Sequence, residues 1–141
     1  MNSIKAFLQP PVMENVEEVV VSKRFVDDDG KPVPFKVRAI SQEINSRLMA
    51  KHTKKKKQDG QIFNELDSTK YMAALVVACT VEPDFKNAEL CSYYKTANPE
   101  DVPLRMLSTG EFARLSRKIR EVNGMMDEED LEEAAEEAKN S

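Results

Sequence analysis

The sequence predicts a mainly α-helical fold of the α+β class, with several short helices packed on one N-terminal antiparallel β-hairpin at about residues 16–40. Two runs within residues 16–40 alternate apolar and polar side chains around a polar turn, which is typical of a hairpin. From residue 41 onward, apolar residues recur at helical spacing behind good N-cap residues. At 141 residues the chain has the size of one domain. We assign this domain to residues 1–126.

The two predicted strands carry apolar side chains on one face. Val19 and Val21 lie on this face in the first strand, and Phe35 and Val37 lie on it in the second. Residues 27–30 (DDDG) supply the turn, because glycine adopts a positive φ at little cost. A two-stranded ribbon is marginal by itself. We therefore expect the helices or a second chain to cover it, and this hairpin to be the only sheet.

The helices are predicted from N-caps and apolar spacing. Residues 67–80 form the most apolar segment and should be the central core helix. Ser108 and Glu111 match a capping box at the start of the last helix, and Gly124 lies just past its end. The predicted helices span residues 3–8, 41–52, 67–80, 87–94, 101–107 and 108–122. Their predicted N-caps are Ser3, Ser41, Asp67 or Ser68, Asn87, Asp101 and Ser108.

Composition excludes several classes of protein. The net charge of −4 argues against broad electrostatic binding to nucleic acid. No apolar run approaches the roughly 20 residues of a membrane span. The apolar part of residues 1–12 is too short for a signal peptide. Cys79 and Cys91 are then expected to be reduced and to pack as small apolar residues in a cytoplasmic protein.

No group of residues has the spacing of a catalytic, cofactor or metal site. Residues 27–30 cannot form an EF-hand, because Phe25 and Lys36 stand where calcium ligands would be needed. His52 is the single histidine and has no zinc-ligand spacing around it. We expect Lys54–Lys57 to be a solvated helix end, followed by a flexible loop at residues 58–61. The sequence therefore predicts a protein that is not an enzyme and binds no cofactor or metal.

Residues 127–141 have a different composition from the rest of the chain. Most of them are acidic, and the few apolar ones are a leucine and alanines. Alanine favours helix, whereas repulsion between acidic residues four apart opposes it. We expect an acidic C-terminal tail that is a frayed helix or disordered.

Several segments together resemble the XkdN-like tail assembly chaperones of contractile-tailed phages and PBSX-like prophages. They occur in the family's order across nearly the whole chain. The segments are VVVSKRFVDDDGKPVPFKVRAIS, LDSTKYMAALVVACTVEPDFKNAELCSYY, NPEDVPLRMLSTGEFARLSRKIREVNG and the acidic end EEAAEEAKNS.

The resemblance implies a non-enzymatic factor that binds the tape measure protein and keeps it soluble before the tail tube polymerises. It also implies two further partners: a longer, frameshifted form of the chain and the tail tube protein. The expected location is the cytoplasm of the bacterial host, and the protein is not expected in the mature virion. The acidic tail would help to keep the loaded complex soluble.

A groove between helices would suit this role, because helix-in-groove binding covers the apolar stripe of a partner helix. The residues that we predict to contact the partner are Phe112, Leu115, Ile119, Met125 and Met126. The alternative for the first three is a purely structural place in the core, which their periodicity also fits.

Two other functions stay open at the level of sequence. One is a structural tail or baseplate component that uses the hairpin for β-augmentation, with Pro34 marking an edge strand. The other is a small DNA-associated regulator that uses Lys54–Lys57. A homo-oligomer would be a natural way to cover the hairpin edge.

Overall fold

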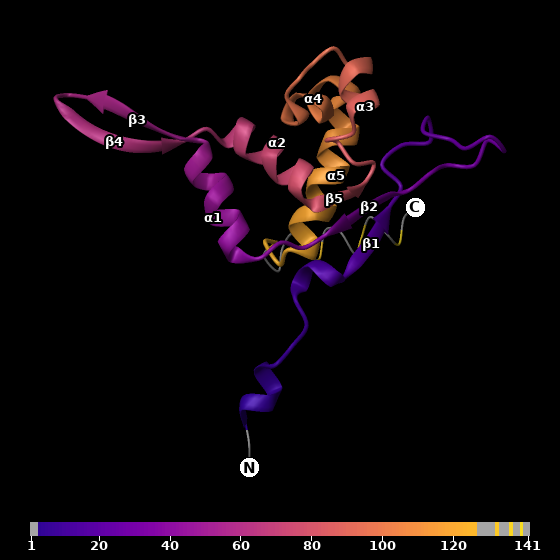
Figure 1. Ribbon diagram of the computed structural model, residues 1–141, viewed down its shortest axis with the longest axis horizontal. Coiled ribbons are helices and arrows are strands. Elements are labelled where there is room, and N and C mark those ends of the chain that lie inside the picture. The colour runs from indigo at the N-terminus through magenta and orange to yellow at the C-terminus, as the bar shows by residue number, and fades with distance from the viewer. Residues whose placement is uncertain (1–2, 127–131, 133–135, 137–138, 140–141) are drawn as a thin grey trace.

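The computed structural model describes residues 3–126 together with residues 132, 136 and 139. The fold combines helices with small antiparallel sheets, which confirms the predicted α+β class (Figure 1). Helices and a three-stranded sheet form the body. The N-terminal segment and a second hairpin project from it (Figure 1). The acidic tail predicted over residues 127–141 lies outside the described residues, apart from the three isolated positions.

The body contains one sheet with the strand order β1-β2-β5. Strands β1 (Val16–Val19) and β2 (Phe35–Arg38) are antiparallel, so the N-terminal hairpin is confirmed. The expectation that this hairpin would be the only sheet is wrong, because β5 (Thr80–Glu82) pairs with the other edge of β2. A strand of three residues that directly follows a helix has no periodicity of its own, and only its pairing with β2 defines it.

The strands β1 and β2 are shorter than predicted, and residues 20–34 form a long connection between them. The predicted turn is present at its tip, where Gly30 has a φ of 78° and its N–H donates to the carbonyl of Asp27 at 3.0 Å. The Val21 carbonyl accepts a hydrogen bond from Arg114 Nε at 2.7 Å. Because side chains of the body bind this backbone, the chain leaves the sheet after Val19.

Helix α2 crosses the centre of the body, as its apolar sequence predicts, and seven of its residues are buried. Ser41, Asn87 and Ser108 are confirmed as caps, and of the two candidates Asp67 and Ser68 it is Asp67 that caps α2; each accepts a hydrogen bond from a backbone N–H of the helix that follows. The side chain of Asp101, also predicted as a cap, makes no such hydrogen bond. The helices are α1 (Gln42–Lys51), α2 (Ser68–Cys79), α3 (Ala88–Tyr93), α4 (Val102–Met106) and α5 (Thr109–Val122). A 3-10 turn, η3 (Pro99–Asp101), leads into α4.

One apolar core joins α2, α5 and the sheet. Helix α5 contacts both β1 and β2, and it also packs on α2. Phe85, from the turn after β5, is fully buried in the same core. The body is therefore held together by contacts between segments that are far apart in the sequence.

The prediction for residues 54–61 is wrong. Instead of a solvated helix end and a flexible loop, β3 (Thr53–Gln58) and β4 (Gln61–Leu66) form a second hairpin. Asp59 and Gly60 have φ values of 53° and 77°, which is the backbone of a tight hairpin turn. The hairpin extends away from the ends of α1 and α2, and its main contacts are between its own two strands (Figure 1).

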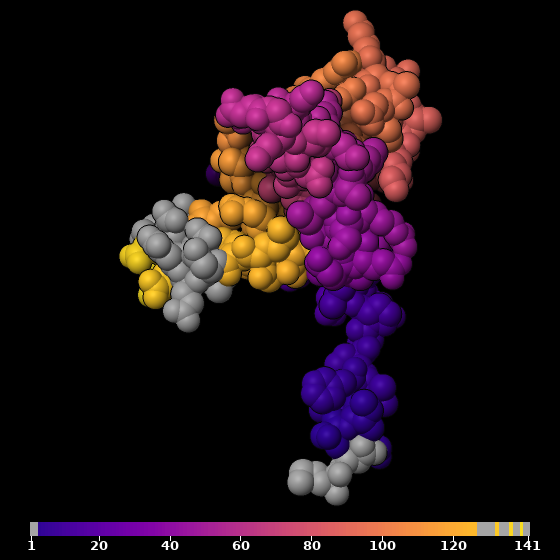
Figure 2. Space-filling model, turned by 90° about the vertical axis from the view of Figure 1, so that its left-hand side faces the viewer, coloured from indigo at the N-terminus to yellow at the C-terminus, as the bar shows by residue number. Residues whose placement is uncertain are grey.

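The N-terminal segment also extends away from the body (Figures 1 and 2). The helical turn predicted over residues 3–8 is the 3-10 turn η1 (Ser3–Phe7), and a second turn, η2 (Val12–Glu14), precedes β1. Neither turn has a buried residue. This segment therefore carries its apolar side chains into solvent.

Candidate partner-binding surface

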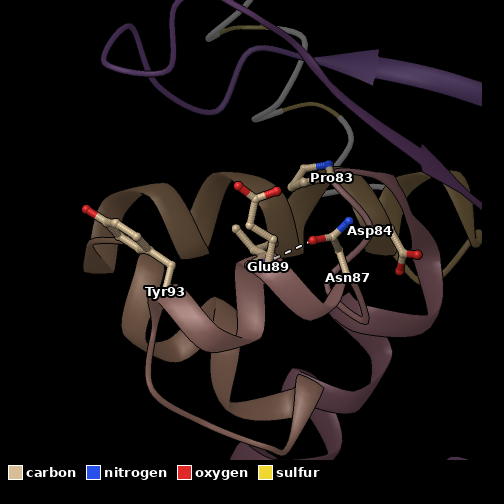
Figure 3. A pocket seen from close by; sticks show the side chains of 6 residues that line it. Pro83, Asp84, Asn87, Glu89 and Tyr93 are labelled. Carbon is tan, nitrogen blue, oxygen red and sulfur yellow. Dashed lines mark hydrogen bonds between the residues drawn. The ribbon is translucent and has the colours of Figure 1, made fainter.

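A pocket of about 370 Å³ opens beside α3, next to the turn that follows β5 (Figure 3). It is mostly apolar inside and has acidic groups at its rim. The residues that line it are Pro83, Asp84, Asn87, Glu89, Leu90 and Tyr93.

The turn before α3 gives the pocket a fixed wall. Asp84 Oδ1 accepts from the N–H of Lys86 at 3.0 Å, and the N–H of Asn87 donates to the Asp84 carbonyl at 2.9 Å. Asn87 Oδ1 then caps α3 by accepting from the N–H of Leu90 at 3.0 Å. Between them, the buried Phe85 anchors the turn in the core.

Helix α3 places an exposed aromatic ring at the other end of the pocket. Tyr93 is 76% exposed and lies across the view from Pro83 and Asp84 (Figure 3). Its ring meets the Tyr94 ring edge-on, with 4.9 Å between centroids. Arg105 Nη1 donates to the carbonyls of Tyr94 and Lys95, which fixes the end of the helix.

These features give the pocket a definite chemical preference. Leu90 is half-buried, so an apolar group that enters the pocket would contact it and the body of Tyr93. Asp84 and Glu89 would favour a ligand with positive charges beside that apolar group. Exposed tyrosines are common in protein interfaces, where one side chain offers an apolar ring and a polar hydroxyl. The arrangement suits binding of a polypeptide.

The five residues predicted to contact a partner do not form one exposed surface. Leu115 and Ile119 are fully buried in the core, and Phe112 is half-buried and packs against it. Met125 is 44% exposed and lines a small pocket at the end of α5, and Met126 is half-buried. Only the two methionines therefore lie outside the core.

Sequence reasoning missed the α3 pocket, although one signal was available. Tyr93 and Tyr94 are adjacent in a short helix, and adjacent helical residues point in directions about 100° apart. Both rings cannot face one core, so an exposed aromatic residue was foreseeable. Its partner Pro83 comes from a turn whose position depends on tertiary packing.

Apart from Tyr93, the most exposed of the large apolar side chains lie on the two projecting segments. The N-terminal segment exposes Ile4, Phe7 and Leu8, with Phe7 at 77% and Leu8 at 72%. Ile62, on the β3–β4 hairpin, is 70% exposed. Exposed apolar groups that gather on projecting segments mark places where a protein can meet a partner.

Glu111 is the acidic residue of the body whose pKa departs furthest from its ordinary value, and its role is structural. Arg24 donates to Glu111 through Nε at 2.7 Å and Nη2 at 2.8 Å, and the N–H of Ser108 donates at 2.8 Å. The Arg24 guanidinium, followed by Ser22, holds the pKa of the Glu111 carboxyl well below its usual range despite burial. This completes the predicted capping box and ties residue 24 to α5.

The remaining candidate groups are also held in structural contacts. Burial raises the pKa of the Cys79 thiol to about 11, so that thiol is a poor nucleophile. Cys91 is half-buried, and its Sγ donates to the Phe85 carbonyl at 3.3 Å. His52 Nε2 lies 2.9 Å from Glu100 Oε1, so this contact joins the end of α1 to η3. The part of the chain that the structure describes contains no group of three or more His, Cys, Asp or Glu residues arranged to hold a metal ion.

The helices of the described residues were also compared with the requirements of a membrane span. Over residues 3–126 and the three isolated described positions, no helix combines the length and the apolar composition needed to cross a bilayer.

Comparisons with known proteins identify similar chains. A sequence model of the phage XkdN-like tail assembly chaperone proteins matches residues 4–139. XkdN, a protein of the phage-like element PBSX of Bacillus subtilis (strain 168), is 39% identical over 139 residues, which cover 96% of this chain and 93% of XkdN. YqbN of the same strain is 46% identical over 121 residues, covering 84% of this chain and 81% of YqbN. The crystal structure of YqbN superimposes with a TM-score of 0.68 at 39% identity, covering 80% of this chain and 87% of that chain.

Proposed function

Since this chain belongs to the phage XkdN-like tail assembly chaperone family, we propose that it binds the tape measure protein and keeps it soluble before the tail tube polymerises. It acts in the cytoplasm of the bacterial host, without catalysis, and it leaves before the virion is complete. The observation that carries this proposal is the apolar pocket beside α3, with the exposed ring of Tyr93 at its rim.

The pocket acts as an anchor for one side of a partner helix. Its volume of about 370 Å³ is near the lower end of ligand pockets, so it accommodates one or two apolar side chains. A tape measure segment with an apolar stripe would insert such a side chain against Leu90 and Tyr93. Lysine or arginine residues one turn away would then face Asp84 and Glu89.

The exposed apolar residues of the N-terminal segment provide a second contact. Ile4, Phe7 and Leu8 are spaced i, i+3 and i+4, and all three are exposed on the projecting segment. Several weak contacts along one long partner add by avidity. Each of them still dissociates when tube subunits compete for the same stripe.

The contact residues predicted on α5 take different roles in this proposal. Leu115 and Ile119 act only by holding the fold, because they have no exposed surface. Phe112 supports them from the edge of the core. Met125 and Met126 follow the end of α5 and extend the apolar contact, which adaptable methionine side chains suit.

Co-expression with tape measure segments tests the proposal. Tyr93→Asp places a charge in the apolar contact without disturbing the core, since Tyr93 is 76% exposed. We expect this variant to weaken binding at least about tenfold, as loss of an interface hot spot does, and to lower the soluble yield of the partner. Binding is measured by calorimetry and the soluble yield by sedimentation of the lysate.

Val26→Asp is the matched control, because it makes the same change at an apolar residue that is 49% exposed on another part of the chain, the connection between β1 and β2. Undiminished binding by Tyr93→Asp would remove the pocket from the proposal. Undiminished capture by Met125→Asp with Met126→Asp would remove those two residues. If the unmodified chain fails to keep any tape measure segment soluble, the chaperone function itself is wrong.

A structural tail component is the second candidate, and the free edge of β1 favours it. Strand β1 lies at the edge of the three-stranded sheet and is largely exposed, so another strand could pair with it. A structural component must persist in the particle. Mass spectrometry of purified virions or prophage particles separates the two candidates, because abundance supports the component and absence supports the chaperone.

A further inference from the structure

Strand β3 carries four consecutive lysines, Lys54–Lys57, on a hairpin that projects from the body (Figure 1). A helix end would explain such a run by its favourable interaction with the helix dipole. In the structure the four lysines instead lie on a strand, which directs them alternately to two faces, and all four are exposed. The helix dipole therefore does not account for them.

Most of the positive charge on this hairpin has no acidic partner. Lys56 Nζ lies 2.8 Å from Glu65 Oε2, so one lysine is compensated within the hairpin. No ion pair with another residue that the structure describes is formed by Lys54, Lys55 or Lys57. Three exposed ammonium groups are thus available to an anionic ligand.

The net charge of the whole chain conceals this basic element. Residues 127–141 hold eight acidic residues and one basic residue, a net charge of −7, so residues 1–126 carry +3 of the total of −4. Residues 53–66 contain four lysines and two acids, which leaves +2 on the hairpin. A net negative charge weakens long-range attraction to nucleic acid, but salt screens it beyond about 8–10 Å, and lysines in direct contact still bind phosphates.

The register gives the two strands of the hairpin different chemistry on one shared face. Lys55 lies across from Asn64, and Lys57 lies across from Ile62, so these four side chains point the same way. Ile62 is 70% exposed. The exposed side-chain amide of Asn64 forms no hydrogen bond within the described part of the chain. The β3 side of this face is therefore basic, and the β4 side offers an amide and an apolar group.

The shape of the hairpin fits the major groove of B-form DNA. The two strands of a ribbon lie about 4.8 Å apart, and such a ribbon enters a major groove about 12 Å wide but not a minor groove of about 6 Å. The four lysines extend over about 10 Å, which equals the rise of about three phosphates along one DNA strand. The hairpin has its main contacts within itself and most of its residues are exposed, so the body does not cover it.

A second polypeptide strand suits this hairpin less well. Lysines on an exposed edge strand discourage pairing with another strand, and β3 has lysines on both of its faces. The same lysines attract phosphates. The observations therefore favour a nucleic acid over a strand from another protein.

We propose that the β3–β4 hairpin binds double-stranded DNA in its major groove. The lysines of β3 contact the phosphates of one DNA strand, and Asn64 and Ile62 of β4 face the base edges. An asparagine amide pairs with the N6 and N7 atoms of adenine, and an apolar side chain contacts the thymine methyl group, so this face favours A·T pairs. The contact is separate from the α3 pocket and does not depend on the proposed chaperone function.

Fluorescence anisotropy of a labelled DNA duplex, titrated with the full chain, tests the proposal. We expect binding in the micromolar range at about 50 mM salt, with a slope of about −3 in a plot of log K against log salt concentration, because three lysines displace counterions. Lys55→Gln with Lys57→Gln should weaken binding at least about tenfold and reduce the slope to about −1. Lys23→Gln with Lys31→Gln is the matched control, which removes two exposed charges from the connection between β1 and β2 and should leave the slope unchanged.

Comparison of nucleic acids tests the groove contact itself. A duplex of A·T pairs should bind about fivefold more tightly than one of G·C pairs, and Asn64→Ala should remove this preference without changing the salt slope. Duplex RNA should bind at least about fivefold more weakly than duplex DNA, because its major groove is too deep and narrow for a ribbon. Tyr93→Asp should leave DNA binding unchanged, which separates this contact from the α3 pocket.

Several results would overturn the proposal. One is the absence of binding at about 50 mM salt, and another is a salt slope that the double glutamine variant leaves unchanged. Equal affinity for duplex RNA would exclude insertion into the major groove, and equal affinity for poly-glutamate would make an acidic polypeptide the partner. Equal affinity for A·T and G·C duplexes would overturn the placement of Asn64 and Ile62 on the base edges. Loss of DNA binding in Tyr93→Asp would place the DNA at α3 instead of the hairpin.

Discussion

The two hairpins of this chain begin from similar turns and end in different surroundings. Each has an acidic residue followed by a glycine with positive φ at its tip, at Asp29-Gly30 and at Asp59-Gly60. The β1–β2 hairpin is covered by α5 and extended by β5, so Phe35 and Val37 are buried. The β3–β4 hairpin has its main contacts within itself, and most of its residues are exposed.

The difference shows how side-chain composition decides whether a hairpin joins the core. The turn chemistry only brings two strands together. Strand β2 alternates buried and half-buried residues and so offers one apolar face to α5. Strand β3 offers lysines on both faces, and burying those would cost far more than it gains. The first hairpin is thus part of the core, and the second stays outside it.

The largest expected change in the free energy of unfolding comes from replacing a core leucine by alanine, and an exposed isoleucine serves as its counterpart. Leu115→Ala should lower the free energy of unfolding by about 3 kcal/mol, because the side chain is fully buried between α5 and the rest of the core. Ile62→Ala on the second hairpin should change it by less than about 0.5 kcal/mol. Urea denaturation followed by circular dichroism measures both values. A small effect at Leu115 would contradict its assignment to the core and return it to the contact surface.

Sequence patterns predicted the parts of the fold that local chemistry determines. Ser41, Asn87 and Ser108 were placed correctly as caps, and Asp67 was one of two candidates for its helix, because an N-cap needs only its own side chain and the backbone of the next turn. The turn at Gly30 was predicted for the same reason. Leu115 and Ile119 could be assigned to one apolar face, but spacing alone could not distinguish a core face from a binding face.

The parts that failed depend on tertiary contacts or on a weak signal. Strand β5 forms because it pairs with the second edge of β2. Residues 20–34 leave the sheet where two contacts tie them to α5: Arg24 binds Glu111, and Arg114 binds the Val21 carbonyl. Strand β3 was missed because a run of lysines is not typical of a strand, although Asp59-Gly60 is typical of a hairpin turn. The α3 pocket was missed because it forms only where the turn at Pro83 packs next to α3.

An ion pair with one buried partner should matter more for stability than a fully exposed pair. Glu111→Gln keeps a side-chain acceptor for the cap but removes the charge that Arg24 binds with two hydrogen bonds. We expect a loss of about 2 kcal/mol in the free energy of unfolding at pH 7. Glu43→Gln removes the exposed pair with Arg47 within α1 and should cost less than about 0.5 kcal/mol.

The same pair makes stability depend on pH. The pKa of Glu111 is held low in the folded chain by Arg24, whereas a glutamate in the unfolded chain has a pKa of about 4.3. As the pH falls below that value, only the unfolded chain takes up the proton, so the stabilisation by Glu111 is lost progressively. The difference in stability between the wild-type chain and Glu111→Gln should therefore narrow between pH 5 and pH 3. A constant difference over this range would contradict a depressed pKa.

The smallest effects come from two glycines with the same backbone geometry, one in each kind of surroundings. Gly124 follows α5 with a φ of 67°, and Gly60 lies at the tip of the second hairpin with a φ of 77°. An added Cβ meets no atom within 4 Å at either position, so alanine is penalised only by the backbone conformation, at about 1 kcal/mol. The Gly124→Ala penalty should appear in global unfolding, because α5 is part of the core.

At Gly60 the same penalty should remain local. Gly60→Ala should leave the urea midpoint unchanged and instead speed hydrogen exchange of the amides in residues 53–66 by about fivefold, which corresponds to about 1 kcal/mol of local opening. Hydrogen-exchange mass spectrometry of the two variants provides the measurement. A shift of the urea midpoint by Gly60→Ala would mean that the second hairpin unfolds together with the body, and the two hairpins would then differ in exposure but not in cooperativity.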